Sequence, residues 1–231
     1  MWEGKYNGSK VIVISPEFNA TAVHADLWVP IKAGYDGHLA MSIMHEMVAH
    51  DLFDREKAAI FTDLPFLVRK DNGKMLTLHD IDPEWKGFDK ALYETMSAVV
   101  PGGETHSHEV FLSWNTATSK VTMMPGSEGS PLKTLRLVER DWTIQPALSG
   151  TREVQLHDGS TVEVHTVFDC LEKELEKFSP ELTQPLTGVH PVTVSILARD
   201  IALPEVVSVT MGFSLGKHFN GMLTQRAMSS M

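Results

Sequence analysis

The sequence predicts an α/β protein with a Rossmann-like parallel sheet, flanking helices and an inserted region of β and irregular structure. Strand-like and helix-like segments alternate over about the first 60 residues, which is typical of βαβ units. Turn dipeptides then dominate the middle of the chain, and helical patterns return in its last third. We therefore expect a Rossmann-like dinucleotide-binding part at 1–70, an insertion at 71–166, and helices with a strand and a binding turn at 167–231.

Each early element has a local signature. The run at 10–14 is short, apolar and β-branched, which predicts a buried strand. A turn at Pro16 and a short helix precede a second strand at 27–31. Helical patterns follow at 39–50 and 54–61.

The later elements are predicted in the same way. "EVFLSWN" and "KVTMMP" indicate one hairpin, and "TREVQL" with "TVEVHTV" indicates a second, with Asp158-Gly159 as a two-residue turn. Helices are expected at 168–178 and 191–202. A buried strand at 206–210 and a final helix close the chain.

Composition excludes several classes of protein. The chain has 231 residues, 42% of them hydrophobic and 22% charged, as globular proteins do. Its net charge of −10 argues against nucleic-acid binding, which needs clustered Lys and Arg. No apolar run approaches the roughly 18 to 20 residues of a membrane span, so we expect no membrane insertion. A single cysteine, Cys170, excludes an internal disulfide.

Both ends of the chain lie inside predicted elements. The first strand begins almost at once, and the final helix runs to Met231 without a capping glycine or polar tail. We expect a fragment of a larger subunit.

The segment Gly212-Phe213-Ser214-Leu215-Gly216 has the letters of a hydrolase nucleophile elbow. Such hydrolases place an acid and a histidine after the serine. Here only His218 follows, and no Asp or Glu does. We favour a tight turn whose free backbone N–H groups and neighbouring Lys217 cradle an anion.

Two histidine motifs resemble metal sites. In "HEMVAH", His45 and His50 are five residues apart, about 140° around a helix, whereas one ion needs a spacing of four. His106 and His108 have no third ligand nearby in the sequence. We predict no metal ligand in either motif.

The stretch "IKAGYDG" leaves two roles open for Asp36. Because it precedes a helix, Asp36 is a candidate N-cap. Alternatively, its two carboxylate oxygens match the adjacent N–H donors of guanine. Gly34 lets the loop pass close to the base, and Ser15 follows the first strand, where doubly wound folds contact ribose or phosphate.

Residues 11–47 closely resemble the dinucleotide-binding segment of the molybdopterin oxidoreductases, the dimethyl sulfoxide reductase superfamily. The matching motifs include Ser15-Pro16-Glu17-Phe18 and the loop with Lys32, Gly34 and Asp36. "FTDLPFLVR" is similar to a signature of the respiratory nitrate reductase branch, which includes perchlorate, chlorate and selenate reductases, nitrite oxidoreductase, and ethylbenzene and dimethyl sulfide dehydrogenases. Later stretches match the same branch in order: "DGSTVEVHTVFD", "SPELTQPLTGVHPVTVSILARDIA" and "GFSLGKHFNGMLTQR".

The resemblance implies a molybdenum bis-(pyranopterin guanine dinucleotide) cofactor, with tungsten in some members. Asp36 then binds a guanine, with Lys32 and Gly34 in the same loop. Ser15 and Pro16 approach the ribose or diphosphate. Four later residues are implied at the pterin or phosphate region: Gly212, Ser214, Lys217 and His218.

The resemblance also implies a redox enzyme of anaerobic respiration. Its subunit carries an iron–sulfur cluster whose ligands this chain lacks, and electrons pass to an iron–sulfur electron-transfer subunit. A small-molecule substrate reacts at the metal. Substrate, compartment and oligomeric state are not predicted, and the isolated chain is not expected to be active. The alternative is a stand-alone guanine-nucleotide-binding module without redox activity.

Overall fold

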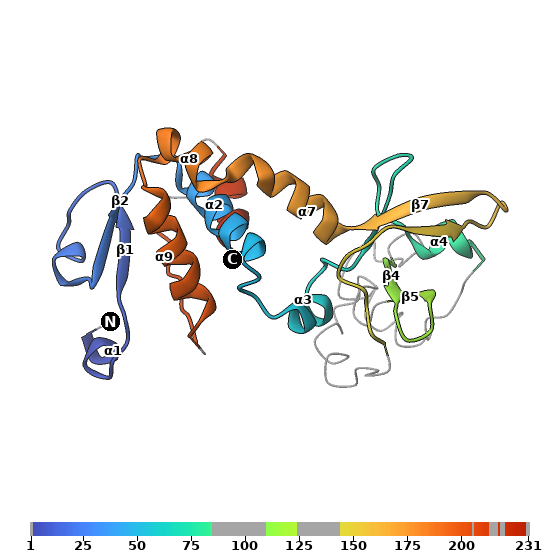
Figure 1. The fold of residues 1–231 in the computed structure, drawn as a ribbon, viewed down its shortest axis with the longest axis horizontal. Coiled ribbons are helices and arrows are strands. Elements are labelled where there is room, and N and C mark those ends of the chain that lie inside the picture. The colour runs from blue at the N-terminus through green and yellow to red at the C-terminus, as the bar shows by residue number, and fades with distance from the viewer. Residues whose placement is uncertain are drawn as a thin grey trace, which may run out of the picture. The chain divides into compact units, whose positions relative to one another are not determined.

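The computed structural model describes residues 2–84, 110–123, 144–204, 206–212, 217 and 220–229 (Figure 1). The chain divides into two compact units, one of residues 1–53 with 172–231 and one of residues 54–171. The expected boundaries were 70/71 and 166/167. Helix α7 (Val167–Leu175) contains the second observed boundary.

The first unit is a mixed α/β structure with a small parallel sheet, as predicted. Its strands pair in parallel, with Ile12 opposite Leu27 and Ser15 opposite Pro30. Its elements are β1 (Ile12–Ser15), β2 (Leu27–Pro30), α1 (Trp2–Tyr6), η1 (Ala22–His24), α2 (Asp36–Ala49), η3 (Glu176–Phe178), α8 (Pro180–Thr187), α9 (Pro191–Ala202) and α10 (Gly221–Ser229).

The core of this unit joins the sheet to α2 and α9, and Figure 1 shows α9 beside the strands. Val29 of β2, Ile43 of α2 and Leu197 of α9 are each at most 2% exposed. Burying side chains of this size contributes about 1.5–3 kcal/mol each. The parallel strand pair therefore depends on α2, which follows it in the sequence, and on α9, which lies more than 150 residues away.

Polar contacts fix α2 against its two neighbouring helices. Thr183 Oγ1 of α8 donates to Ser42 Oγ at 3.0 Å, and Ser195 Oγ of α9 donates to Glu46 at 2.5 Å. Ser42, Thr183 and Glu46 are buried, so their polar atoms need such partners. The rotation of α2 about its axis is thereby fixed.

Asp26 ties the start of β1 to β2. Its carboxylate accepts the Val11 N–H at 2.8 Å and pairs with Lys5 at 2.9 Å. These contacts, the Val11 hydrogen bond first, lower the pKa of Asp26 below its usual value of 3.8.

The second unit is built on antiparallel pairs. One sheet has the order β3-β7-β6, and β4 and β5 form a separate hairpin. A buried cluster that includes Leu67, Leu112 and Val164 fills the space between them. Its elements are α3 (Arg55–Phe61), β3 (Leu67–Arg69), α4 (Leu78–Ile81), β4 (Leu112–Asn115), β5 (Lys120–Met123), β6 (Arg152–Gln155) and β7 (Thr161–Thr166).

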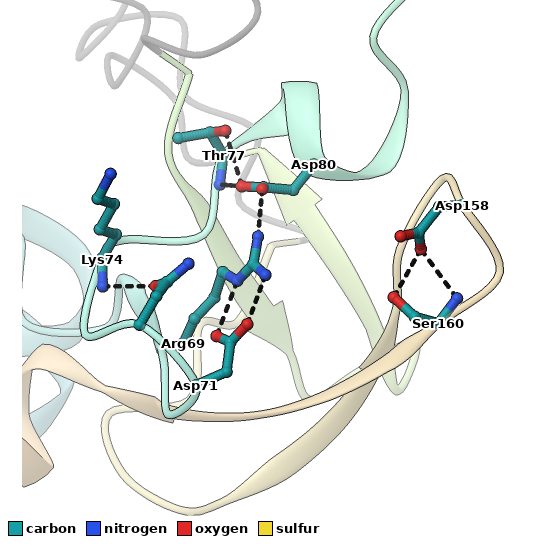
Figure 2. Close-up of polar contacts among 8 residues, drawn as sticks. Arg69, Asp71, Lys74, Thr77, Asp80, Asp158 and Ser160 are labelled. Atoms are coloured by element: carbon teal, nitrogen blue, oxygen red, sulfur yellow. Dashed lines mark hydrogen bonds and ion pairs between the residues drawn. The ribbon is translucent and has the colours of Figure 1, made fainter.

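Both predicted hairpins are confirmed, but the turn of the second differs. Leu156 N–H donates to the Ser160 carbonyl at 2.8 Å, so the loop has three residues, not two. Gly159 takes the left-handed conformation at φ 82°. Figure 2 shows the Asp158 carboxylate accepting from both the N–H and the hydroxyl of Ser160, which stabilises this longer loop.

The strand predicted at 206–210 is wrong. Residues 206–210 form no strand and pair with no described residue, and Val206 is 85% exposed. The β-branched composition favours extended backbone, but a strand also needs a neighbour to complete its hydrogen bonds. The helix expected at 39–50 is confirmed, although it begins earlier, at Asp36.

Arg69 organises the polar side of β3 in the second unit (Figure 2). Its guanidinium donates two parallel hydrogen bonds to Asp71, at 3.0 and 2.6 Å, and a third to Asp80 at 2.6 Å. The Asp71 bonds are the main cause of a raised Arg69 pKa and a lowered Asp71 pKa. Asp80 also accepts from the N–H and hydroxyl of Thr77, the N-cap of α4.

Replacing Asp80 with Ala is expected to lower the free energy of unfolding by about 1–2 kcal/mol, because it removes a capping box and an ion pair together. Urea unfolding followed by circular dichroism measures this. Asp71→Ala is the matched control: Asp71 is 48% exposed and caps no helix, so its loss should be smaller. Equal losses for the two variants would contradict this ranking.

Candidate functional site

The carboxyl ends of β1 and β2 bring two loops to one edge of the parallel sheet. Ser15 and Pro30 end the two strands and lie opposite each other. Pro16 and Lys32 therefore leave the sheet on the same side. In open parallel sheets, ligands bind at this edge.

Ser15 is already engaged within the protein. Its hydroxyl donates to the Glu17 carbonyl at 2.7 Å and accepts the indole N–H of Trp28 at 3.1 Å. Phe18 packs edge-on against Trp28, with ring centroids 5.1 Å apart. A serine hydroxyl has one proton and two lone pairs, so Ser15 keeps one acceptor position. The sequence did not predict this contact of Trp28.

Lys32 is tied to the end of α8. Its backbone N–H donates to the Thr187 carbonyl at 2.9 Å, and its ammonium donates to the Pro185 carbonyl at 2.9 Å. A cation at a helix C-terminus is favourable because the last carbonyls lack partners. The ammonium has three donors, and its side chain remains exposed.

Gly34 turns the loop into α2. Tyr35 N–H donates to the Lys32 carbonyl at 3.3 Å, and Gly34 has φ 86°, so residues 32–35 form a turn that needs a left-handed residue. A Cβ built on Gly34 meets nothing within 4 Å. The requirement for glycine is therefore conformational, and the space beside the loop is open.

Asp36 is not the N-cap of α2. The helix begins at Asp36, and its N-cap, Tyr35, makes no side-chain capping hydrogen bond. An N-cap side chain accepts the backbone N–H of the second or third helical residue. Asp36 is itself the first helical residue, one position too late for this role. The half-buried Asp36 carboxylate has no hydrogen bond or ion pair with any described residue, so both oxygens are available as acceptors.

The C-terminal helix reaches the same end of α2. A Cβ on Gly37 would lie 3.0 Å from Thr224 Oγ1 and 3.5 Å from Thr224 Cα, so α10 packs directly on this glycine. Glycine destabilises a helix, so a glycine within a helical segment often marks the close approach of another element. Gly37 is therefore the sequence signal that could have identified this contact.

The structure describes two of the four C-terminal candidate residues. Gly212 and Lys217 are described, and both are exposed. Ser214 and His218 lie outside the described residues, as do His106 and His108. Because α10 begins at Gly221, the segment that carries these candidates leads into the helix that contacts Gly37.

The "HEMVAH" motif lies elsewhere, toward the other end of α2. His45 and His50 each lie 3.7 Å from the buried Glu46 carboxylate, through opposite oxygens. Within the described ranges, no group of three or more His, Cys, Asp or Glu side chains is arranged to hold a metal ion. No helix among these residues is both long and apolar enough to cross a membrane.

The fold defines a class: a mixed α/β protein with a small parallel sheet, in which the loops after both strands start at one edge. No protein-family model matches the chain. It is 34% identical over all of its 231 residues to the dimethylsulfide dehydrogenase subunit alpha of Rhodovulum sulfidophilum. It is 35% identical over 221 residues to the chlorate reductase subunit alpha of Ideonella dechloratans, and 27% identical over 232 to the respiratory nitrate reductase subunit alpha of Haloferax mediterranei.

The chain belongs to the dimethyl sulfoxide reductase superfamily of molybdopterin oxidoreductases, in the nitrate reductase-like branch. These three matches cover 96–100% of the chain but only 21–22% of each relative. The chain therefore spans about a fifth of the length of these catalytic subunits.

Gly34→Ala is expected to lower the free energy of unfolding by about 1 kcal/mol, because only glycine adopts φ 86° without strain. Denaturant unfolding tests this. Gly4→Ala, in α1, is the control and should be neutral or slightly stabilising, since alanine favours a helix and its Cβ meets nothing closer than 3.5 Å. Identical effects of the two changes would contradict a conformational role for Gly34.

Proposed function

We propose that this chain contributes guanine and phosphate binding to the molybdenum bis-(pyranopterin guanine dinucleotide) cofactor of an oxidoreductase catalytic subunit. The observation that carries the proposal is the Asp36 carboxylate. It lies at the carboxyl edge of the parallel strands, next to an open glycine turn, with no partner among the described residues.

The chemistry of Asp36 fits one edge of guanine. Guanine presents N1–H and an exocyclic amine side by side, and a carboxylate accepts from both with its two oxygens. Adenine offers an acceptor at the first of these positions and therefore cannot make the same pair. Asp36 thus supplies base selectivity.

Ser15 and Lys32 fit the sugar and phosphate parts of the same ligand. The proton of Ser15 is committed to Glu17, so its remaining acceptor suits a ribose hydroxyl better than a phosphate oxygen. Lys32 keeps two donors and a positive charge at the same edge, which suits a diphosphate. Pro16 and Gly34 shape the two loops without contributing side-chain donors.

The C-terminal segment supplies the remaining proposed contacts. Gly212, Ser214, Lys217 and His218 are proposed to meet the pterin or phosphate region of the cofactor, and α10 positions this segment by packing on Gly37. The bound molybdenum group supplies the redox chemistry, and the protein binds and orients it. Iron–sulfur clusters, an electron-transfer subunit and the small-molecule substrate belong to the proposed complete enzyme.

Guanine selectivity can be measured on the 231-residue chain with GMP and AMP as probes. The wild-type chain should bind GMP more tightly than AMP. Asp36→Asn keeps the shape but replaces one acceptor with a donor, so GMP affinity should fall about tenfold or more, while AMP affinity changes little. Isothermal titration calorimetry gives both affinities.

Asp51→Asn is the matched control, since it removes the same charge just beyond the other end of α2. It should leave the preference for GMP unchanged. A wild-type chain without that preference, or an Asp36→Asn chain that retains it, would contradict the proposed function.

A further inference from the structure

Three rings form a row beside the candidate guanine-binding residue. The ring centroids of Tyr35 and His38 are 5.3 Å apart, and those of His38 and Phe178 are 5.9 Å apart. Both pairs are tilted by 58°, and all three side chains are half-buried.

A carboxylate alone holds a base weakly when water surrounds it. An exposed carboxylate contributes little affinity, because water competes for both partners. A base that also stacks on an aromatic ring gains affinity from the stacking, and the ring excludes water from one face of the base. Asp36 is half-buried, so selective binding of guanine also requires a protein surface that covers one face of the base.

The neighbours of Asp36 differ on its two sides. Successive helical residues project about 100° apart, so positions 35 and 37 lie on opposite sides of position 36. On the Gly37 side, α10 approaches within van der Waals contact. On the Tyr35 side lies the aromatic row, supported by Phe178 of η3.

We propose that Tyr35, backed by His38 and Phe178, is the stacking surface for the purine whose edge Asp36 binds. This inference rests on the proposed function and adds a specific contact to it. Stacking acts on the face of the base, and every base has a π face. Tyr35 therefore contributes affinity for purines in general, whereas Asp36 contributes the choice of guanine.

Tyr35→Leu separates the two contributions, because leucine keeps an apolar side chain but has no π face. The affinities for GMP and AMP should fall by a similar factor, about five- to tenfold, leaving their ratio unchanged. Tyr35→Phe should retain wild-type affinity, since the ring remains. Calorimetric titration of the 231-residue chain measures all of these values.

Tyr6→Leu is the matched control, because Tyr6 is 86% exposed on α1 of the same unit. It should bind both nucleotides as the wild type does. Thermal unfolding of each variant checks that the fold is kept.

The outcomes distinguish the inference from the function on which it rests. If Tyr35→Leu binds both nucleotides with wild-type affinity while Asp36→Asn loses the GMP preference, the stacking surface is overturned and the guanine site stands. If Tyr35→Leu changes the GMP-to-AMP ratio, a stacking role is equally overturned. If the wild type shows no preference for GMP, the proposed function fails and the stacking surface falls with it.

Discussion

The register of one parallel strand pair determines where every N-terminal candidate residue lies. With Ser15 opposite Pro30, the loops after both strands start at the same edge, and the second loop turns at Gly34 into α2. A shift by one residue would exchange the two faces of a strand and move its apolar side chains out of the core. Asp26 holds this register by accepting the Val11 N–H at the start of the pair.

The strand pair is stable only because two helices cover it, one adjacent in the sequence and one distant. Parallel sheets occur with their faces covered, and two strands alone bury too little surface. Here α9 and α2 provide the cover, and hydrogen bonds from Thr183 and Ser195 to two buried side chains of α2 fix this helix in position. The same helix then presents Asp36 at its first turn and Gly37 to α10. The site and the core therefore share one structural element.

Local signals in the sequence predicted most elements, but two elements differ from the prediction. The strand expected at 206–210 has the right composition, but pairing depends on a partner that composition cannot reveal. Helix α8 was missed although its signals are complete: Ser179 caps it, Pro180 occupies its first position, and Gly188 ends it at φ 78°. At the candidate site, the sequence pointed to the loop that carries Asp36. It did not predict the hydrogen bond of Trp28 to Ser15 or the packing of Thr224 on Gly37, because both contacts depend on tertiary packing.

We propose that a guanine nucleotide binds where the strand edge, the first turn of α2 and the start of α10 meet. Amide chemical-shift mapping by NMR on the 231-residue chain, titrated with GMP, tests this most directly. Chemical-shift changes are expected to concentrate at residues 15–16, 32–38 and 220–224. Shifts confined to the other end of α2, to the second unit, or to no residues at all would contradict it.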